Sequence, residues 1–445
     1  AGMRYLMVHI TGGVLLFGGI VLHGMETGSY LFGPLENTGG LAYSLILISF
    51  ILNAAVPPLN AWLTDAYPEA TVTGAVFLSA FTTKTAVYVL IRAYPGTEIL
   101  IWLGAAMALY GVIYAVLEND CRRLLAYHIV SQVGYMVVGV GIGTEMALNG
   151  TASHAFAHIF YKGLLFMGAG AVIHMTGRRK LTELGGLYRT MPWTVALYMI
   201  GAFAISAFPF FSGFVTKSMV IAAAAGDNRA AVVLMLTVAS SGTFLHTGLK
   251  LPYYMFFAKD CGLRPKEPPI NMLLAMGVAA VLCIGIGLWP GVLYDLLPYP
   301  VDYAPYTGAH ITGSLSILMF TALGFFLFLR SLDPERTISL DTDWLYRKAA
   351  RWFMWFAEKP VARWEGMVSG LSDTVIWRSL NAAARGSLSS DRDIVDAFVN
   401  GVARTALAWG ASARRMQTGV VTHYAGAMIG GVLASIALYV LLRSG

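Results

Sequence analysis

Long apolar runs recur along most of the chain, and this pattern limits its fold more than any other feature of the sequence. Each run is long enough to cross a hydrocarbon core of about 30 Å as a helix. With 57% hydrophobic and only 12% charged residues, the composition excludes a soluble globular domain. The sequence therefore predicts an all-α, polytopic membrane helix bundle. The expected crossings are 5–24, 41–63, 72–93, 98–117, 124–143, 148–175, 191–226, 229–257, 270–294, 308–330 and 420–442.

Two of these crossings contain prolines and are expected to be broken helices. Pro57 and Pro58 interrupt the second crossing, while Pro209 and Gly213 interrupt 191–226, which is too long for one straight crossing. Irregular backbone is tolerated inside a membrane only where it is buried in protein or lines a cavity. Two discontinuous helices at corresponding places are typical of transporters built from inverted repeats. Simple proline kinks, which are common in membrane helices, are the alternative.

The charges of the loops predict the orientation of the chain. If 191–226 crosses only once, one side of the membrane receives most of the loop arginines and lysines, and the positive-inside rule makes that side cytoplasmic. The acidic turn at Asp65 and Glu69 is the exception. An odd number of crossings then places residue 1 in the cytoplasm and Gly445 on the opposite side of an inner membrane. Because topology explains the net charge of +6, no nucleic-acid partner is expected.

The composition changes after residue 330. Residues 331–343 are polar, and 344–418 mix basic with aromatic side chains. This mixture predicts an amphipathic helix that lies at the membrane surface in contact with lipid. The pattern begins with Trp344, Arg347, Lys348, Arg351, Trp352 and Trp355.

The length of this segment suggests a lateral arm. If it is helical, it reaches on the order of 100 Å, although Pro360, Gly386 and Gly410 are expected to interrupt it. Because 420–442 returns to the membrane, the arm would be fixed at both ends and could clamp neighbouring subunits. An ordinary cytosolic tail is the alternative.

Three titratable side chains recur every four residues in an otherwise apolar run. His154, His158 and Lys162 would share one face of the helix expected at 148–175. Ionisable groups inside spanning helices face a protein interior or a water-filled cavity and find partners there. Histidine titrates near neutral pH, and burial favours the neutral form of lysine. The three residues are therefore a candidate proton path, with contacts that only hold the bundle together as the alternative.

Two further lysines are placed in the same way. Lys84 lies in the middle of 72–93, and Lys217 follows the break at Pro209. With Lys162 they form a set of three lysines, which His154 and His158 are suited to connect. A structural contact explains any one of these lysines well, but it explains the whole set less well.

Other polar residues are accessory candidates. Ser240 and His246 are expected to line the path. His128 is expected close to the cytoplasmic surface, as a proton entrance or as an interfacial histidine. The role of Asp65 is left open: it could hold a loop, bind a cation or supply a proton entry. Glu69 is expected to be structural.

The sequence carries no recognisable signature of catalysis or of a cofactor. It has no Walker loop, no dinucleotide-binding glycine motif and no quinone or haem signature. Cys121, Cys261 and Cys283 are too widely spaced for a metal or disulfide pattern. We therefore expect a transport subunit with no catalytic site, cofactor or metal of its own, driven by an ion gradient or by a partner.

Several stretches resemble the antiporter-like family shared by Mrp-type cation/proton antiporters and the proton-pumping membrane subunits of respiratory complex I, with the Mrp D subunit as the best match. The resemblance covers about residues 1–330, and the arm and last helix match the largest complex I antiporter-like subunit more weakly. The most specific stretches are PPLNAWLTDAYPEATVTGAVFL, ENDCRRLLAYHIVSQVGYMVVGVG, HAFAHIFYKGLLFMGAGAVIH and ISAFPFFSGFVTKSM.

The resemblance implies two inverted repeats, each with a broken helix, and a central axis of lysines and histidines that carries protons. Lys84 matches the lysine of the first half, His154, His158 and Lys162 match the connecting positions, and Lys217 matches the lysine of the second broken helix. The implied domains are a remnant of the first repeat at 1–97, a complete second repeat at 98–257, two additional helices at 258–330, the lateral arm at 331–418 and a membrane anchor at 419–445.

Two departures from the family pattern stand out. Asn53 replaces the lysine that usually precedes the first proline pair, so this position cannot titrate. The chain also lacks the first five helices of the family, including the one that carries the glutamate partner of that lysine. We therefore expect either that a separate polypeptide supplies these helices, or that protons cross by the second half alone.

The sequence thus predicts an antiporter-like subunit of a multisubunit membrane complex, which translocates protons and possibly exchanges them for Na⁺. A structural membrane anchor that no longer pumps is one alternative. A proton-pumping subunit of a redox-driven complex, such as a relative of complex I or a membrane-bound hydrogenase, is the other.

Overall fold

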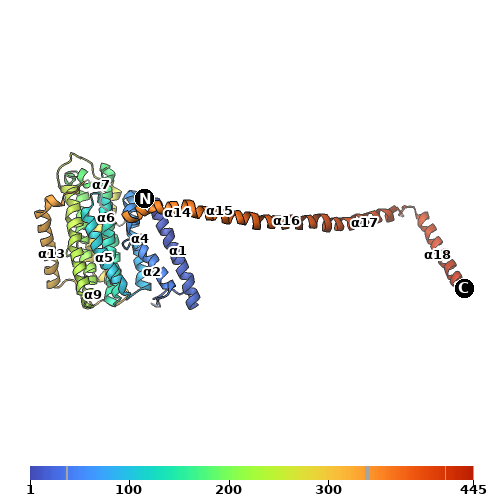
Figure 1. Ribbon diagram of the computed structural model, residues 1–445, viewed down its shortest axis with the longest axis horizontal. Helices are drawn as coiled ribbons and strands as arrows, with labels where there is room; N and C mark the ends of the chain where they lie inside the picture. The colour runs from blue at the N-terminus through green and yellow to red at the C-terminus, as the bar shows by residue number, and fades with distance from the viewer. Residues whose placement is uncertain (37–38, 336–340, 342, 416, 444–445) are drawn as a thin grey trace. The chain divides into compact units, whose positions relative to one another are not determined.

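The computed structural model describes residues 1–36, 39–335, 341, 343–415 and 417–443. The chain divides into two units, Ala1–Tyr346 and Arg347–Gly445. The first unit is a bundle of helices of membrane length, and the second is a long helical segment followed by one more such helix (Figure 1). The predicted all-α class is therefore confirmed.

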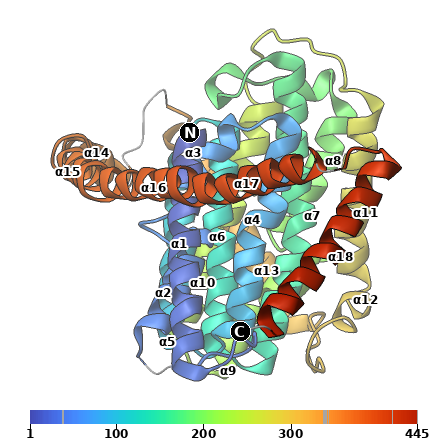
Figure 2. The same ribbon diagram turned by 90° about the vertical axis from the view of Figure 1, so that its right-hand side faces the viewer.

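The helices of the first unit follow the expected crossings closely. Figure 2 shows α1 beside α2, with which it packs. Within the described residues, nine helices are long and apolar enough to span a membrane, one of them in the second unit. The unbroken helices of the first unit are α1 (Gly2–Thr27), α4 (Val72–Ala93), α5 (Glu98–Leu117), α6 (Cys121–Ile142), α7 (Glu145–Thr176), α10 (Ala230–Thr243), α11 (Ile270–Leu288) and α13 (Gly308–Leu327), with a short α12 (Gly291–Tyr294).

The two broken helices form where the prolines predict them. In the first, α2 (Leu41–Asn53) ends before the proline pair and α3 (Ala61–Glu69) begins after it. In the second, α8 (Pro192–Ile205) and α9 (Ser212–Gly226) flank Pro209. Both breaks turn through an alanine in the left-handed region, Ala55 with φ 59° and Ala207 with φ 57°. The same backbone turn therefore occurs in both interruptions.

Gly213 does not interrupt the helix, contrary to the sequence-based expectation. It lies in the first turn of α9, where a Cβ atom would overlap the carbonyl oxygen of Ala204 at the end of α8. The glycine therefore permits the two half-helices to approach each other, and Pro209 alone marks the break.

Glycines also allow the backbones of α5 and α6 to approach each other closely in the core. The added Cβ of Gly104 on α5 would lie 2.6 Å from the carbonyl oxygen of Gly134 on α6, and the reverse distance is also 2.6 Å. Small residues allow membrane helices to pack backbone against backbone in this way. The result is that α6 is buried along almost its whole length and forms the centre of the bundle.

The segment after α10 departs from a regular α-helix. Phe244–Lys250 and Tyr253–Phe257 are π-helical turns, which sequence periodicity did not predict. Such turns occur often at functional sites, because they rotate side chains out of the regular register. Here they leave both His246 and Lys250 buried.

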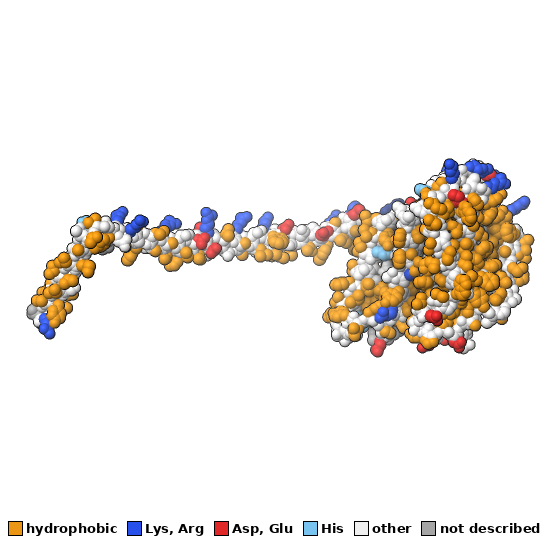
Figure 3. Space-filling model, turned by 180° about the vertical axis from the view of Figure 1, so that it is seen from behind, with side chains coloured by type: hydrophobic (Ala, Val, Ile, Leu, Met, Phe, Trp, Pro, Cys, Tyr) orange, Lys and Arg blue, Asp and Glu red, His pale blue; other side chains and the backbone are white. Residues whose placement is uncertain are grey.

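Charge is distributed unevenly over the first unit. Lys and Arg side chains gather at one end of the bundle, and several Asp and Glu side chains lie at the other (Figure 3). We call these the basic end and the acidic end. The basic end includes the loop residues Arg178, Arg179, Lys180 and Arg189.

The second unit contains the predicted amphipathic arm. Helical structure continues through α14 (Asp343–Phe356), α15 (Ala362–Leu371), α16 (Arg378–Ser390) and α17 (Asp396–Arg415), joined by π-helical turns. Hydrophobic side chains lie along one edge of the arm, and Lys and Arg project from the other (Figure 3). The last helix is α18 (Val421–Arg443).

Two of the three interruptions expected in the arm are wrong. Pro360 does lie in a π-helical turn, but Gly386 and Gly410 lie inside α16 and α17. A glycine costs a helix only about 1 kcal/mol and keeps its N–H group, whereas proline removes a hydrogen bond. The glycines are therefore absorbed into continuous helix.

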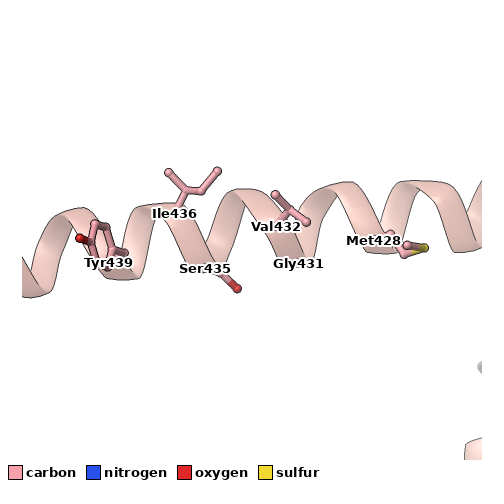
Figure 4. Close-up of a pocket in the computed structure, with 6 residues that line it drawn as sticks. All are labelled: Met428, Gly431, Val432, Ser435, Ile436 and Tyr439. Carbon is pink, nitrogen blue, oxygen red and sulfur yellow. The ribbon is translucent and has the colours of Figure 1, made fainter.

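The shallow hollow on α18 is the surface of a single helix. All six residues that line it, from Met428 to Tyr439, come from α18, and Gly431 supplies the gap between larger side chains (Figure 4). No second element contributes a wall, so this hollow is not a candidate site.

Candidate functional site

The centre of the candidate site is a contact between α7 and α6. Lys162 Nζ lies 3.0 Å from His128 Nδ1, and both side chains are fully buried. On the far side of the ring, His128 Nε2 lies 3.3 Å from the Thr243 hydroxyl at the end of α10. Lysine, imidazole and hydroxyl therefore form a continuous hydrogen-bonded chain across three helices.

This chain continues toward the π-helical turn after α10. The ring of His246 lies 5.0 Å from the ring of His128, centroid to centroid, and is also fully buried. The Thr247 hydroxyl lies 2.6 Å from His246 Nδ1 and satisfies that nitrogen. His246, predicted to line the path, thus lies next to His128.

His128 is not close to the surface, which corrects the sequence-based expectation. It lies about two turns into α6, and α6 is enclosed by the helices around it. The arginines that suggested a surface position, Arg122 and Arg123, are at the start of the same helix. His128 therefore lies in the interior of the bundle, in contact with Lys162, and not at the end of its helix.

The two predicted histidines of α7 lie one helical turn apart. The centroids of the His154 and His158 rings are 6.1 Å apart, and His154 Nδ1 lies 3.3 Å from the Tyr161 hydroxyl. Within the described residues, neither nitrogen of His158 has a hydrogen-bond partner, nor does Nε2 of His154. Buried ring nitrogens usually have a hydrogen-bond partner, so these three atoms stand out among the described polar groups.

Lys84 lies on α4, which packs against α7. Its Nζ donates to the carbonyl oxygen of Ser79 at 2.5 Å and to the Thr83 hydroxyl at 3.4 Å. Its charge would act on His158 and Lys162, so it lies within electrostatic reach of both. No direct hydrogen bond between Lys84 and either residue occurs among the described residues.

Lys217 lies at the second broken helix. Its Nζ is 3.5 Å from the carbonyl oxygen of Ile205, the last residue of α8, and 5.5 Å from the centre of the Tyr135 ring. The carbonyls at the end of a helix have no partner within the helix, and the helix dipole favours a cation there. The break in the chain therefore creates the binding position for this lysine.

A cavity of ≈ 550 Å³ opens beside Lys217. Ser240, predicted to line the path, contributes to its wall and hydrogen-bonds Tyr135. The other polar residues that line the cavity are Ser206, Ser218, Thr237, Tyr303, Thr307, His310 and Ser314. Lys217 thus borders a cavity that is lined in part by polar residues.

The first broken helix differs from the second in the side chain that bonds its helix end. There the indole N–H of Trp62 donates to the carbonyl oxygen of Leu52, at 3.1 Å, so a neutral group occupies the end of α2. Asn53, the last residue of α2, is half-buried and faces Gly12 of α1. In the described part of the chain, a tryptophan and not a lysine therefore occupies the helix end at the first break.

Asp65 is held in an ion pair. Its carboxylate contacts the guanidinium of Arg4 on α1, and its side chain is 11% exposed. Glu69, expected to be structural, pairs with Arg179 at 2.9 Å. Of the roles considered for Asp65, this ion pair favours a structural one, in which the residue holds a loop.

Sequence reasoning missed several buried polar residues of the site. Gln132 Nε2 lies 3.3 Å from the Thr243 hydroxyl, and Tyr135 lies between Lys217 and His154. Lys250 was also missed, although His246 and Lys250 have the same spacing of four residues as His158 and Lys162. That spacing was the signal that could have identified Lys250. Among the described residues, no group of three or more His, Cys, Asp or Glu side chains is arranged to hold a metal ion.

Comparisons with known proteins agree with this architecture. The family model described as NADH:quinone oxidoreductase/Mrp antiporter, TM, matches residues 1–244. Hydrogenase-4 component B of Escherichia coli (strain K12) is 31% identical over 333 residues, which cover 65% of this chain and 49% of that protein. The D subunit of the Na(+)/H(+) antiporter of Alkalihalophilus pseudofirmus is 31% identical over 312 residues, which cover 62% of each chain. The chain thus spans about half the length of the first relative and less than two thirds of the second.

A solved structure extends the likeness to the arm. A chain in the membrane-bound sulfane sulfur reductase, an archaeal respiratory membrane complex, has the same fold with a TM-score of 0.63 and 21% identity. The match covers 98% of this chain and 76% of that one. Because the family model matches more than half of the sequence, this multi-pass membrane protein belongs to the NADH:quinone oxidoreductase/Mrp antiporter family of membrane subunits.

Proposed function

We propose that the chain is an antiporter-like subunit that translocates protons along a buried axis through Lys84, His158, Lys162, His128 and Lys217. The contact between Lys162 and His128 carries this proposal, because it joins two titratable side chains that are both fully buried. Ionisable residues in this position are costly and are characteristic of proton relays.

The axis divides into three parts with different roles. Lys162 is the central carrier, and His154 and His158 relay protons on α7. Lys217 exchanges protons with the cavity beside the second break. Lys84 connects the axis to the first half of the bundle, with water between it and His158 satisfying the ring nitrogens that have no protein partner among the described residues.

Electrostatic repulsion couples the lysines. Lys84 and Lys162 lie within reach of each other's charge, and two like charges in a low-dielectric interior disfavour each other strongly. A proton on one therefore promotes release from the other. This behaviour moves charge along the axis without any large movement of the helices.

The setting we propose is a multisubunit complex in a cell inner membrane, with residue 1 cytoplasmic and Gly445 on the opposite side. The segregation of Lys and Arg to one end of the bundle supports this orientation (Figure 3). The names of the relatives, a hydrogenase component and a Na(+)/H(+) antiporter subunit, support two ways of driving transport. These are a redox reaction in a partner subunit and an exchange of protons for Na⁺.

A second candidate function is that of a structural anchor. The arm supports it, because the described hydrophobic side chains along one of its edges are exposed (Figure 3). In that case the arm holds neighbouring subunits together and the lysines have no role in transport. Deleting 344–418 would then disperse the complex, whereas lysine substitutions would have no effect on transport.

Substitutions in the purified complex separate the two functions. We expect Lys217→Ala and His158→Ala each to abolish ion movement in vesicles while the complex still assembles. Lys266→Ala, a change of an exposed loop lysine, is the matched control and should transport normally. Wild-type transport in both axis variants would contradict the proton path.

A further inference from the structure

A buried hydroxyl group lies where the end of α10 meets α6, beside the central contact of the axis. Thr243, the last residue of α10, has its hydroxyl oxygen 3.3 Å from His128 Nε2 and 3.3 Å from Gln132 Nε2. All three side chains are fully buried. Threonine and glutamine do not titrate, so a role for these two residues lies in how they hold the histidine.

The hydroxyl of Thr243 uses all of its hydrogen-bonding sites. It donates its proton to the carbonyl oxygen of Ala239, one turn earlier in α10, at 2.9 Å. A hydroxyl has one donor and two acceptor sites, so its oxygen can only accept from its other two contacts. Gln132 Nε2 donates to one acceptor site. His128 Nε2 must therefore carry a proton in order to donate to the other.

This arrangement sets the tautomer of His128. When the proton of a neutral imidazole is on Nε2, the lone pair is on Nδ1. His128 Nδ1 lies 3.0 Å from Lys162 Nζ. The ring is therefore oriented to accept a proton from an ammonium at Lys162, and it can do so without rotating and without losing its bond to Thr243.

The opposite tautomer would suit neither neighbour. A proton on Nδ1 would point at a charged Lys162, and the bare Nε2 would face a hydroxyl whose proton is given to Ala239. The other groups whose charges act on His128 are His246, His158 and Lys217. Within the described residues, no hydrogen bond joins any of these three to the ring, so Thr243 and Lys162 are the contacts that decide the tautomer.

Gln132 supports this assignment because its side chain has a single hydrogen bond among the described residues. Its Nε2 donates to Thr243, whereas its buried Oε1 has no described partner. Burying an amide with an unpaired oxygen costs free energy, so an apolar side chain would serve packing alone better. What the amide contributes is the contact with Thr243, which fills an acceptor site and keeps the hydroxyl proton directed at Ala239.

We propose that Thr243 and Gln132 are positioning residues, which hold His128 in the tautomer that receives a proton from Lys162. In this step an N–H bond of the Lys162 ammonium breaks and an N–H bond forms at His128 Nδ1. The products are a neutral amine and an imidazolium that still donates to Thr243 from Nε2. This inference rests on the proposed function, because the transfer is a step of the same path.

Nitrogen-15 solid-state NMR of the assembled complex tests the tautomer directly. The histidine signals that disappear in His128→Gln identify His128. At alkaline pH, where the imidazole is neutral, we expect the proton on Nε2 alone. Thr243→Val removes the oxygen from a side chain of similar shape and should add a population protonated on Nδ1, whereas Thr243→Ser keeps the hydroxyl and should not. A wild-type His128 protonated on Nδ1, or an unchanged tautomer in Thr243→Val, would overturn the proposal.

Proton transport in vesicles gives a second measurement. Thr243→Val should lower the rate by about tenfold, less than the loss of an acid–base group itself, and should shift the pH at which the rate is half-maximal. Gln132→Leu should act in the same direction, and Thr243→Ser should restore the wild-type pH profile. The matched control is Thr312→Val, because the exposed hydroxyl of Thr312 bonds the carbonyl oxygen of Gly308 in its own helix, at 2.7 Å. This variant should transport normally.

The outcomes separate this inference from the proposal on which it rests. If Lys217→Ala and His158→Ala abolish transport but Thr243→Val keeps the wild-type rate and pH profile, the positioning role is overturned and the axis stands. If the axis variants also transport normally, both are overturned. A reduced rate in Thr243→Val that Thr243→Ser does not rescue would show a packing effect of the side chain and would overturn the role of the hydroxyl.

Discussion

Lys162 Nζ and His128 Nδ1 are 3.0 Å apart, and each residue comes from a helix near the centre of the bundle, α7 and α6. If Lys162 is an ammonium, it must donate and His128 must accept through an unprotonated Nδ1. The proton of a neutral His128 then lies on Nε2, which faces the Thr243 hydroxyl. The protonation state of the lysine therefore fixes the tautomer of the histidine, and a proton can move from one side of the ring to the other.

His128→Ala should block this step. We expect it to lower proton transport by about a hundredfold or more, because a lost relay group cannot be replaced within the buried path. His128→Gln keeps a polar side chain of similar length but cannot carry a proton, so it should be equally impaired. Transport in vesicles with a pH-sensitive dye measures the effect, and Lys180→Ala on the exposed basic end is the control. Normal transport in His128→Gln would remove His128 from the path.

Because the backbones of α5 and α6 are in contact, we expect one added methyl group at Gly134 to lower the stability of the protein. The Cβ of Gly134→Ala would lie 2.6 Å from the carbonyl oxygen of Gly104 and 2.7 Å from the amide nitrogen of Ala108. The two helices must separate, which should cost about 1–3 kcal/mol. Thermal unfolding of the purified complex should report a lower Tm.

Gly277→Ala on α11 is the control for this substitution, because its Cβ would have no neighbour within 4 Å. It should leave the Tm unchanged or raise it slightly, since alanine has the higher helix propensity. Equal stability of Gly134→Ala and Gly277→Ala would contradict the close contact.

The membrane helices could be predicted from the sequence because their cause is local. Apolar length decides whether a segment spans, and Pro57, Pro58 and Pro209 remove backbone hydrogen bonds wherever they occur. The positions of His154, His158 and Lys162 on one helix face followed from their spacing alone. These features require no knowledge of what the helices contact.

The partners of the buried groups could not be predicted in the same way. The contact of His128 with Lys162 depends on how α6 packs against α7, and no local pattern carries that information. The π-helical turn at His246 shifts the register by which side chains are assigned to a face. Asp341 joins Tyr110 and Tyr127 across more than two hundred residues. The sequence therefore indicated several of the buried ionisable groups but not how they contact one another.

Arg122 is expected to have a structural role that its charge alone does not suggest. Its guanidinium donates to the carbonyl oxygens of Pro68, Ala70 and Thr71, at 3.2, 2.8 and 3.0 Å, and so closes the turn between α3 and α4. Arg122→Lys cannot reach three acceptors with the same planar geometry. Leaving the buried carbonyl of Pro68 and its part-buried neighbours without donors should cost about 1–3 kcal/mol.

Hydrogen exchange measures this effect at the turn itself. Amides around residues 70–75 should exchange faster in Arg122→Lys, because the turn opens more often. Arg178→Lys is the control, since Arg178 is exposed and its contact with Glu183 is long, at 3.6 Å. Unchanged exchange at the turn in Arg122→Lys would show that the three hydrogen bonds contribute little.

If the amphipathic arm holds the complex together through its apolar edge, we expect charges on that edge to disrupt the complex. Trp364 and Leu371 on α15 are separated by seven residues, so they lie on the same side of the helix, and they are 69% and 68% exposed. Replacing both by glutamate places two charges on the edge that we propose contacts lipid or a neighbouring subunit, and each charge moved out of water there would be costly. We expect the complex to dissociate in mild detergent, as measured by native electrophoresis.

Ser369→Glu adds the same kind of charge to the opposite side of α15 and should leave the complex intact, because that side faces the polar edge of the arm. If Ser369→Glu dissociates the complex as readily as the double variant, the arm is sensitive to charge in general, and its apolar edge is not the surface that holds the subunits together.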